Sequence, residues 1–158
     1  MTVPLRLSVR RADVALPGTV APRTALRISV RVPSELDVVE QAVDVVARHC
    51  IAAGLSARRA RFNLRVALCE ALANAMIYGN ALDPAKAVEV HVTVTEPQLR
   101  VEVVDEGNGF DATHFDDVCL PDDLEATGGR GLFLIRQLVD DVYLNERGNT
   151  ICMVLRRA

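Results

Sequence analysis

Glu70 and Asn74 are the residues whose types and spacing most directly suggest chemistry in this chain. They stand four positions apart in "CEALANAMIYGN", a segment with the apolar spacing of an amphipathic helix, so their side chains are neighbours on one shoulder of its buried stripe. A carboxylate can serve as a general base, and an amide oxygen is a ligand that suits Mg²⁺. On this pair alone, a solvated helix edge is the more frequent explanation.

A second segment, "VEVVDEGNGFD", places Asp105 at the end of an alternating strand. A carboxylate there can accept a hydrogen bond from an exocyclic amine. Gly107 and Gly109 allow a positive φ and the close approach of a flat ring to the backbone. A lone DxGxG is more often an ordinary glycine-rich turn, so this segment also leaves two interpretations open.

A third segment, "TGGRGLFLI", lies where a long loop leads into a helix. Gly128, Gly129 and Gly131 expose backbone N–H groups at the helix start, and such groups attract phosphate. Arg130 adds a forked cation. The alternative is a flexible helix entry without a ligand.

The loop before this helix is strongly acidic. It has no Lys or Arg between Val101 and Gly129, and it contains Asp105, Glu106, Asp111, Asp116, Asp117, Asp122, Asp123 and Glu125. A bare polyphosphate would be repelled by this charge, so a phosphate ligand needs Mg²⁺ and Arg130 to offset it. Otherwise the acids only keep a mobile loop solvated.

The elements that must position these residues follow from periodicity. We expect a strand over 24–33, a helix capped by Ser34 and ended by Gly54, and a second helix from Ser56 to Tyr78. Alternation then predicts a hairpin, followed by the loop over 106–130, a helix and a final hairpin. The strands of the first hairpin span residues 87–96 and 98–105, the helix spans 131–142, and the final hairpin spans 143–157. Helices segregated from antiparallel hairpins indicate an α+β sandwich with helices on one sheet face.

Length and composition agree with one domain of 158 residues, half of them apolar and a quarter charged. The net charge of −3 argues against direct nucleic-acid binding. Residues 1–23 show no sustained period and are expected to be a flexible extension before a domain over 24–158. The four cysteines have no zinc spacing, and the sequence has neither a signal peptide nor a membrane-spanning run. We therefore expect a cytoplasmic protein with reduced thiols.

Taken together, the three motifs resemble the ATP-binding fold of gyrase, Hsp90, histidine kinases and MutL (GHKL) over residues 24–157. Within that superfamily the chain is most similar to bacterial anti-sigma regulatory factors that are serine/threonine protein kinases. The segments that carry the similarity are "EALANAMIYGNALDPAKAVEV", "VVDEGNGFD" and "GGRGLFLIRQLVDDV". The resemblance implies a Bergerat-type two-layer sandwich, with helices on a mixed, mostly antiparallel sheet and a long ATP lid.

The resemblance also implies roles for individual residues. Glu70 would be the general base toward a substrate hydroxyl, Asn74 would hold Mg²⁺ at the phosphates, and Asp105 would accept from the adenine amine. The other cofactor-binding residues would be Gly107 and Gly109 beside the adenine, Gly128, Gly129, Arg130, Gly131 and Leu132 on the phosphate side, and Thr150 on the last hairpin. Tyr78 stands where the family often has His, and Asn108 stands where a small residue or proline is common.

The implied activity is an ATP-dependent serine/threonine kinase that binds a sigma factor and phosphorylates a STAS-type anti-anti-sigma protein, with a homodimer among the implied arrangements. Two alternatives stay open: a nucleotide-binding partner-switching module without phosphotransfer, and a detached histidine-kinase-type ATPase domain. A basic cluster at the start of the second helix could dock an acidic partner or form an ordinary solvated face. It consists of Arg58, Arg59, Arg61 and Arg65.

Overall fold

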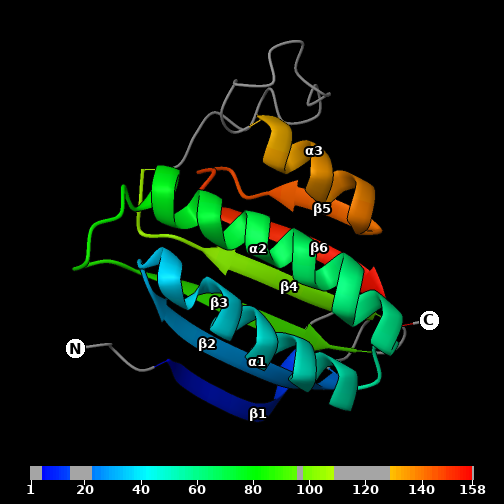
Figure 1. Ribbon diagram of the computed structural model, residues 1–158. Coiled ribbons are helices and arrows are strands. Elements are labelled where there is room, and N and C mark those ends of the chain that lie inside the picture. The colour runs from blue at the N-terminus through cyan, green and yellow to red at the C-terminus, as the bar shows by residue number, and fades with distance from the viewer. Residues whose placement is uncertain (1–4, 15–22, 96–97, 109–128, 158) are drawn as a thin grey trace.

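The fold is a single antiparallel sheet with helices on one face, as a computed structural model of the chain shows (Figure 1). The structure describes residues 5–14, 23–95, 98–108 and 129–157. Six strands lie in the order β1-β2-β3-β4-β6-β5, and each described pairing is antiparallel. This confirms the expected α+β sandwich with helices on a mostly antiparallel sheet.

The elements follow the chain in the predicted order, with one strand added at the start. Their bounds are β1 Arg6–Val14, β2 Arg23–Pro33, η1 Leu36–Val38, α1 Val39–Ala52, η2 Arg59–Leu64, α2 Arg65–Asn74, η3 Ala75–Gly79, β3 Ala87–Val94, β4 Gln98–Val104, α3 Gly129–Leu138, β5 Asp141–Leu144 and β6 Thr150–Arg156. Most of the predicted long loop, residues 109–128, lies outside the described residues.

The core lies between the helices and the sheet face that they cover. Alternate residues of β2, such as Ile28 and Val30, are fully buried and pair with the equally buried Val92 and Val90 of β3. From the helix side, Leu64 and Leu68 fill the same core, as the predicted apolar stripe requires. Residues between these positions point to the opposite, helix-free face of the sheet.

The second predicted helix is one continuous helical segment with three geometries. A π-helical stretch, η2, leads into α2, and a second one, η3, follows Asn74 directly. Ser56 begins this segment as predicted, because its Oγ accepts the Arg59 backbone N–H at 3.3 Å. Gly79 ends it, also as predicted.

Ser34 does not cap the first helix, which corrects the sequence prediction. Residues 36–38 form the short 3₁₀ helix η1 before α1, and no side chain caps either element. The Ser34 hydroxyl is buried and instead donates to the Lys86 carbonyl oxygen at 2.8 Å. The residue type suited a cap, but a tertiary partner holds this hydroxyl in place.

Strand β1 was not predicted. Residues 1–23 have no sustained alternation of apolar and polar side chains, yet nine of them, Arg6–Val14, pair with β2 as an edge strand. Edge pairing depends on backbone hydrogen bonds more than on a buried face, so a weak pattern is sufficient. The division of the chain at residue 23 and the flexibility of the first segment stay predictions.

Candidate functional site

Glu70 and Asn74 meet Gly131 across the contact between α2 and α3. Both side chains are half-buried on the shoulder of α2, as the helical wheel predicts. A Cβ atom added to Gly131 would stand 2.9 Å from Asn74 Nδ2 and 3.0 Å from Glu70 Oε2. Because only glycine fits here without moving those atoms, the start of α3 can come close to the base–amide pair.

Asp105 lies at the other end of the same helical segment, against Gly79 and Gly107. Its carboxylate accepts the Gly107 backbone N–H at 2.8 Å, and its own N–H donates to the Asn149 carbonyl at 3.0 Å. A Cβ atom at Gly79 would collide with the Asp105 carboxylate, and one at Gly107 would collide with the Gly79 carbonyl. Gly107 does not take the positive φ that the sequence suggested, and the close approach at this glycine is that of the chain's own Gly79 carbonyl; the approach of a ligand ring stays a prediction.

The environment of Asp105 disfavours its charged form. Partial burial raises the pKa of the carboxyl from its ordinary value of 3.8, and this effect outweighs the hydrogen bond from Gly107 and the more distant charges of Arg147 and Lys86. A half-buried carboxylate at a strand end keeps an acceptor available for a donor on a ligand.

The two ends of the site are separated by the length of one helical segment. From Glu70 to Gly79 the chain stays helical, which corresponds to about 13 Å along a helix axis. A carboxylate and an amide therefore occupy one end, and an amine-accepting carboxylate beside two glycines occupies the other. This arrangement suits an elongated ligand with a polar charged end and a flat ring end.

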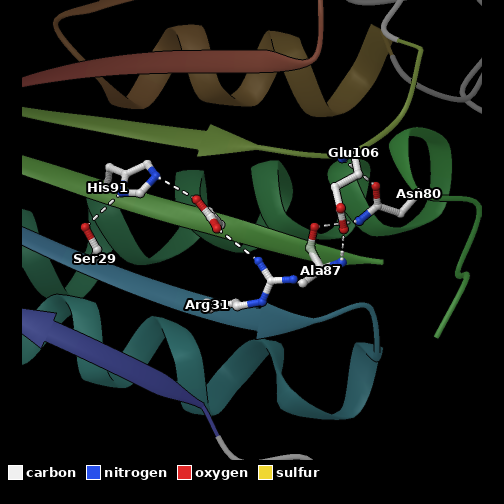
Figure 2. Close-up of polar contacts among 7 residues, drawn as sticks. Ser29, Arg31, Asn80, Ala87, His91 and Glu106 are labelled. Carbon is white, nitrogen blue, oxygen red and sulfur yellow. Dashed lines mark hydrogen bonds and ion pairs between the residues drawn. The ribbon is translucent and has the colours of Figure 1, made fainter. Parts of the chain in front are cut away.

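Asn80 holds the ring end together, and sequence reasoning missed it. The side chain is fully buried, and its Oδ1 accepts the Glu106 backbone N–H at 2.8 Å (Figure 2). Its Nδ2 donates to the Ser34 hydroxyl at 2.9 Å and to the Ala87 carbonyl at 3.1 Å. In turn, the Ala87 N–H donates to Glu106 Oε2 at 2.6 Å. One amide thus ties the loop after β4 to β3 and to the end of η3.

The backbone around Asn80 is unusual. The π-helical residues Ala75–Gly79 precede it, and Ala81 and Leu82 follow with φ values of 52° and 55°. π-turns and non-glycine residues in the left-handed region are concentrated at functional sites, where surrounding contacts hold them. The sequence offers one signal for this turn, the Gly79–Asn80 pair, which we used only as a helix end.

The remaining predicted site residues are placed less completely. Gly109 and Gly128 lie outside the described residues, and so does the side chain of Arg130. Gly129 begins α3, and Leu132 is half-buried and packs against the core. Their proposed contacts with a ligand stay predictions.

Thr150 pairs with Val104, one residue before Asp105. Its neighbour Ile151 is part of the core, so alternation directs the Thr150 side chain to the helix-free face of the sheet. The Asp105 carboxylate, by contrast, lies against Gly79 of η3. Thr150 is therefore near the ring end in the sheet, but its side chain is directed to the other face, and its role stays a prediction.

The described residues include no group of three or more His, Cys, Asp or Glu side chains that could hold a metal ion. The available oxygens are those of Asn74 and the adjacent Glu70. This set fits Mg²⁺, which keeps several waters and is held through one or two protein ligands together with substrate phosphates. Zn²⁺, which prefers nitrogen and sulfur ligands, does not fit.

Comparison with known proteins agrees with this geometry. The model of the histidine kinase-like ATPase domain family matches residues 32–155. A curated relative, the serine-protein kinase RsbW of Bacillus subtilis (strain 168), is 33% identical over 98 residues. That match covers 58% of this chain and 61% of the relative.

Among the described residues, no helix is both long and apolar enough to cross a membrane.

Proposed function

This chain belongs to the histidine kinase-like ATPase domain family, and we propose that it is an ATP-dependent serine/threonine protein kinase that also binds a sigma factor. Its substrate would be a STAS-type anti-anti-sigma protein. The observation that carries the proposal is the meeting of Glu70, Asn74 and Gly131, because it combines a base, an oxygen ligand and the start of a helix. The similarity to a serine-protein kinase supports the same choice.

In this proposal, ATP lies along the helical segment with adenine at Asp105 and phosphates at α3. The Asp105 carboxylate accepts from the adenine amine, and Gly107, which packs against the Gly79 carbonyl, keeps the loop after Asp105 close to the end of η3 beside the ring. The N–H groups at the start of α3 then face the phosphates, where the positive end of the helix dipole favours negative charge. Gly109, Gly128, Arg130, Leu132 and Thr150 complete the proposed contacts.

Transfer would use Glu70 as the base. Its carboxylate takes the proton of a serine or threonine hydroxyl as that oxygen bonds to the γ-phosphorus of ATP. The bond between the γ-phosphorus and the bridging oxygen breaks, and ADP leaves with its electron pair. Bound Mg²⁺, held by Asn74, would neutralise phosphate charge, so the protein contributes chiefly positioning and electrostatics.

The proposed partners need docking surfaces, and the basic cluster at the start of the second helix serves this purpose only in part. Arg59 pairs with Asp140 at 2.9 Å, and Arg65 pairs with Asp44. Arg58 and Arg61 are exposed. An acidic partner would therefore meet two of the four arginines without disturbing an ion pair within the chain. A homodimer and the expected cytoplasmic location remain part of the proposal.

Two other functions make different predictions. A partner-switching module would bind ATP and a partner but leave the γ-phosphate in place. Glu70 would then not act as a general base. A detached histidine-kinase-type ATPase domain would pass phosphate to a histidine on a separate protein. The half-buried Glu70 beside Asn74 favours transfer over binding alone.

The test is to incubate the protein with γ-labelled ATP, Mg²⁺ and STAS-type proteins from the same cell. Label that survives acid and is located on serine or threonine supports the kinase. Label that is acid-labile and located on histidine supports the third function. ATP binding without any labelled protein would overturn the kinase proposal in favour of the binding module.

A further inference from the structure

Strand β1 leaves one of its backbone edges free within the described part of the chain. It has nine residues, Arg6–Val14, and pairs on one side with β2. Figure 1 shows it as the outermost strand, with no described element beyond it. It also precedes residues 32–155, which carry the family match. An exposed edge of this length presents a row of N–H and C=O groups ready to pair with another strand.

One face of β1 is apolar and exposed. Leu7 pairs with Val30, which is buried against the helices, so Leu7 lies on the same side of the sheet. Val9 lies on that side too, opposite the buried Ile28. Helix α1 packs against β2 and leaves Leu7 and Val9 44% and 48% exposed. The apolar side of the sheet thus extends past its helical cover.

The opposite face of β1 is strongly basic. Arg6 pairs across the strands with Arg31, and Arg10 pairs with Arg27. Arg31 has an acidic partner, Glu89, at 3.0 Å (Figure 2). Within the described residues, neither Arg6 nor Arg10 has an ion-pair partner, and both are exposed. Four arginines on two adjacent strands repel one another unless acids from elsewhere offset them.

A hollow lies at the N-terminal end of this basic face. Its volume is about 270 Å³, and its lining contains the charged residues Arg6, Arg31 and Lys86. Pro33 and Pro84 form apolar parts of the wall. The hollow lies on the β2 side of Arg6, so Arg31 and Lys86 add positive charge close to Arg6 on this face of the sheet.

We propose that β1 is the docking edge for an extended segment of a partner protein in which acidic and apolar residues alternate. Such a segment would add a seventh strand, with its backbone paired to the free edge of β1. Alternation would place its acidic residues against Arg6 and Arg10 and its apolar residues against Leu7 and Val9. One such segment would thus pair with the free backbone edge, cover the apolar face and neutralise the charge of the basic face.

A second copy of the chain fits this edge poorly. Antiparallel pairing of two β1 strands about Ser8 would place Arg6 opposite the Arg10 of the second copy, twice. Pairing about Arg10 would place two Arg10 side chains opposite each other and would set Val9 against Arg11. Like charges directly opposite each other destabilise a sheet, and although pairing about Leu7 or Val9 avoids them, no register gives both Arg6 and Arg10 an acidic partner, because the strand contains one acid, Asp13. Charge therefore favours an acidic partner over self-association.

Nucleic acid is also a poorer occupant. A phosphate backbone would engage Arg6 and Arg10 but would leave the strand edge unpaired and the apolar face exposed. The described part of this face offers no aromatic side chain within β1 or β2 on which a base could stack. The net charge of −3 further weakens any attraction at long range.

The test uses the full chain and a fluorescent nine-residue peptide that alternates glutamate and valine. We expect saturable binding that a peptide of the same composition, with all glutamates before all valines, does not show. Arg6→Glu with Arg10→Glu should weaken binding of the alternating peptide by roughly tenfold or more and allow a lysine–valine peptide to bind. Arg11→Glu with Arg48→Glu, two exposed arginines that lie off the basic face, changes the net charge by the same amount and is the matched control.

Two further measurements separate strand addition from simple charge attraction. Two N-methylated peptides should be compared, one methylated at the odd-numbered amides and the other at the even-numbered amides. One should lose binding and the other should keep it, because only one edge of the peptide pairs with β1. Equal binding of both methylated peptides, or of the block peptide, would overturn the proposal. Binding of an oligothymidylate in place of the peptide would assign the basic face to nucleic acid instead.

Discussion

The Asp105 carboxylate is half-buried at the end of β4, and its environment has two opposing consequences. Its position against Gly79 and Gly107 suits it to receive a ligand donor. The same burial makes its ionised form costly when no ligand is present. A site residue of this kind should improve binding at the expense of stability.

Asp105→Asn tests the binding side of this conflict. Loss of the charged acceptor should weaken ATP binding by about 1.5–3 kcal/mol, the contribution of a hydrogen bond to a charged group. Isothermal titration calorimetry measures the change, with Asp141→Asn on β5 as the control, because Asp141 is exposed and, among the described residues, its side chain accepts only from its neighbour Val142. An unchanged ATP affinity would remove Asp105 from the site.

The same variant tests the stability side through pH. Because the folded pKa of Asp105 is raised, the ionised group costs stability above that pKa, and the cost disappears as the pH falls through it. Without nucleotide, Asp105→Asn should unfold at a higher temperature than the wild type at pH 7, and the difference should shrink toward about pH 4. A difference that grows on acidification would contradict the burial argument.

For individual residues, the sequence predicted where a side chain lies on its helix or strand better than which tertiary partners it has. Helical spacing correctly placed Glu70 and Asn74 together on the shoulder of α2, because a period of 3.6 residues fixes which side chains are neighbours. It did not identify Asn80, whose three side-chain hydrogen bonds reach segments distant in the chain. A single sequence contains no signal for such tertiary partners.

At the scale of elements, the turn after η3 joins three parts of the site. Asn80 connects η3 to the start of β3 and to the loop that follows β4, and these segments carry Gly79 and Gly107. The π-helical turn and the left-handed residues Ala81 and Leu82 belong to the same connection. We infer that the Asn80 side-chain amide fixes the position of the loop after β4, and with it Asp105, relative to η3.

Asn80→Ala should therefore destabilise the protein strongly. Removal of the side chain leaves the buried Ser34 hydroxyl, the Ala87 carbonyl and the Glu106 N–H without this partner, at a cost of about 2–4 kcal/mol in the free energy of unfolding. Urea denaturation measures this free energy. Asn63→Ala is the matched control, because Asn63 makes one half-buried bond to Leu138 and should cost only about 1 kcal/mol. Equal losses would contradict a special role for Asn80.

Alternation and apolar spacing predicted α1, α2, α3 and the strands β2 to β6, since each buries one face against the same core. The last helix was predicted to run over 131–142, but α3 ends at Leu138 and β5 begins at Asp141, because apolar residues at helical spacing also continue into this strand. The π-turns escaped prediction because they alter the helical period by less than one residue per turn. Ser34 was misassigned because a serine before a helix is a good cap unless a buried partner competes for its hydroxyl.

For the molecule as a whole, β1 is structurally separable from the ATP site. Leu5, just before β1, packs against the core, while Leu7 and Val9 of the strand itself are exposed. Asp105 follows β4, which β2 and β3 separate from β1 in the sheet order, and Glu70 lies on helix α2. The extension and the remainder of the chain should therefore perform different tasks.

A chain that begins at Arg23 should keep its nucleotide site. We expect cooperative unfolding and an ATP affinity within about twofold of the full chain, because distant sites contribute independently. Binding of the alternating glutamate–valine peptide should be lost. A truncated chain that folds but no longer binds ATP would show that β1 is an integral part of the catalytic domain.

Glu70→Gln is the variant that decides whether this ATPase-family chain transfers phosphate with Glu70 as the base. ATP affinity and phosphate transfer to a STAS-type protein should be measured on the same sample, with Glu40→Gln on the exposed side of α1 as the control. We expect nearly unchanged ATP binding and a loss of transfer of about 10²–10⁴-fold, the usual contribution of a general base. Transfer by Glu70→Gln at the wild-type rate would contradict this role of Glu70.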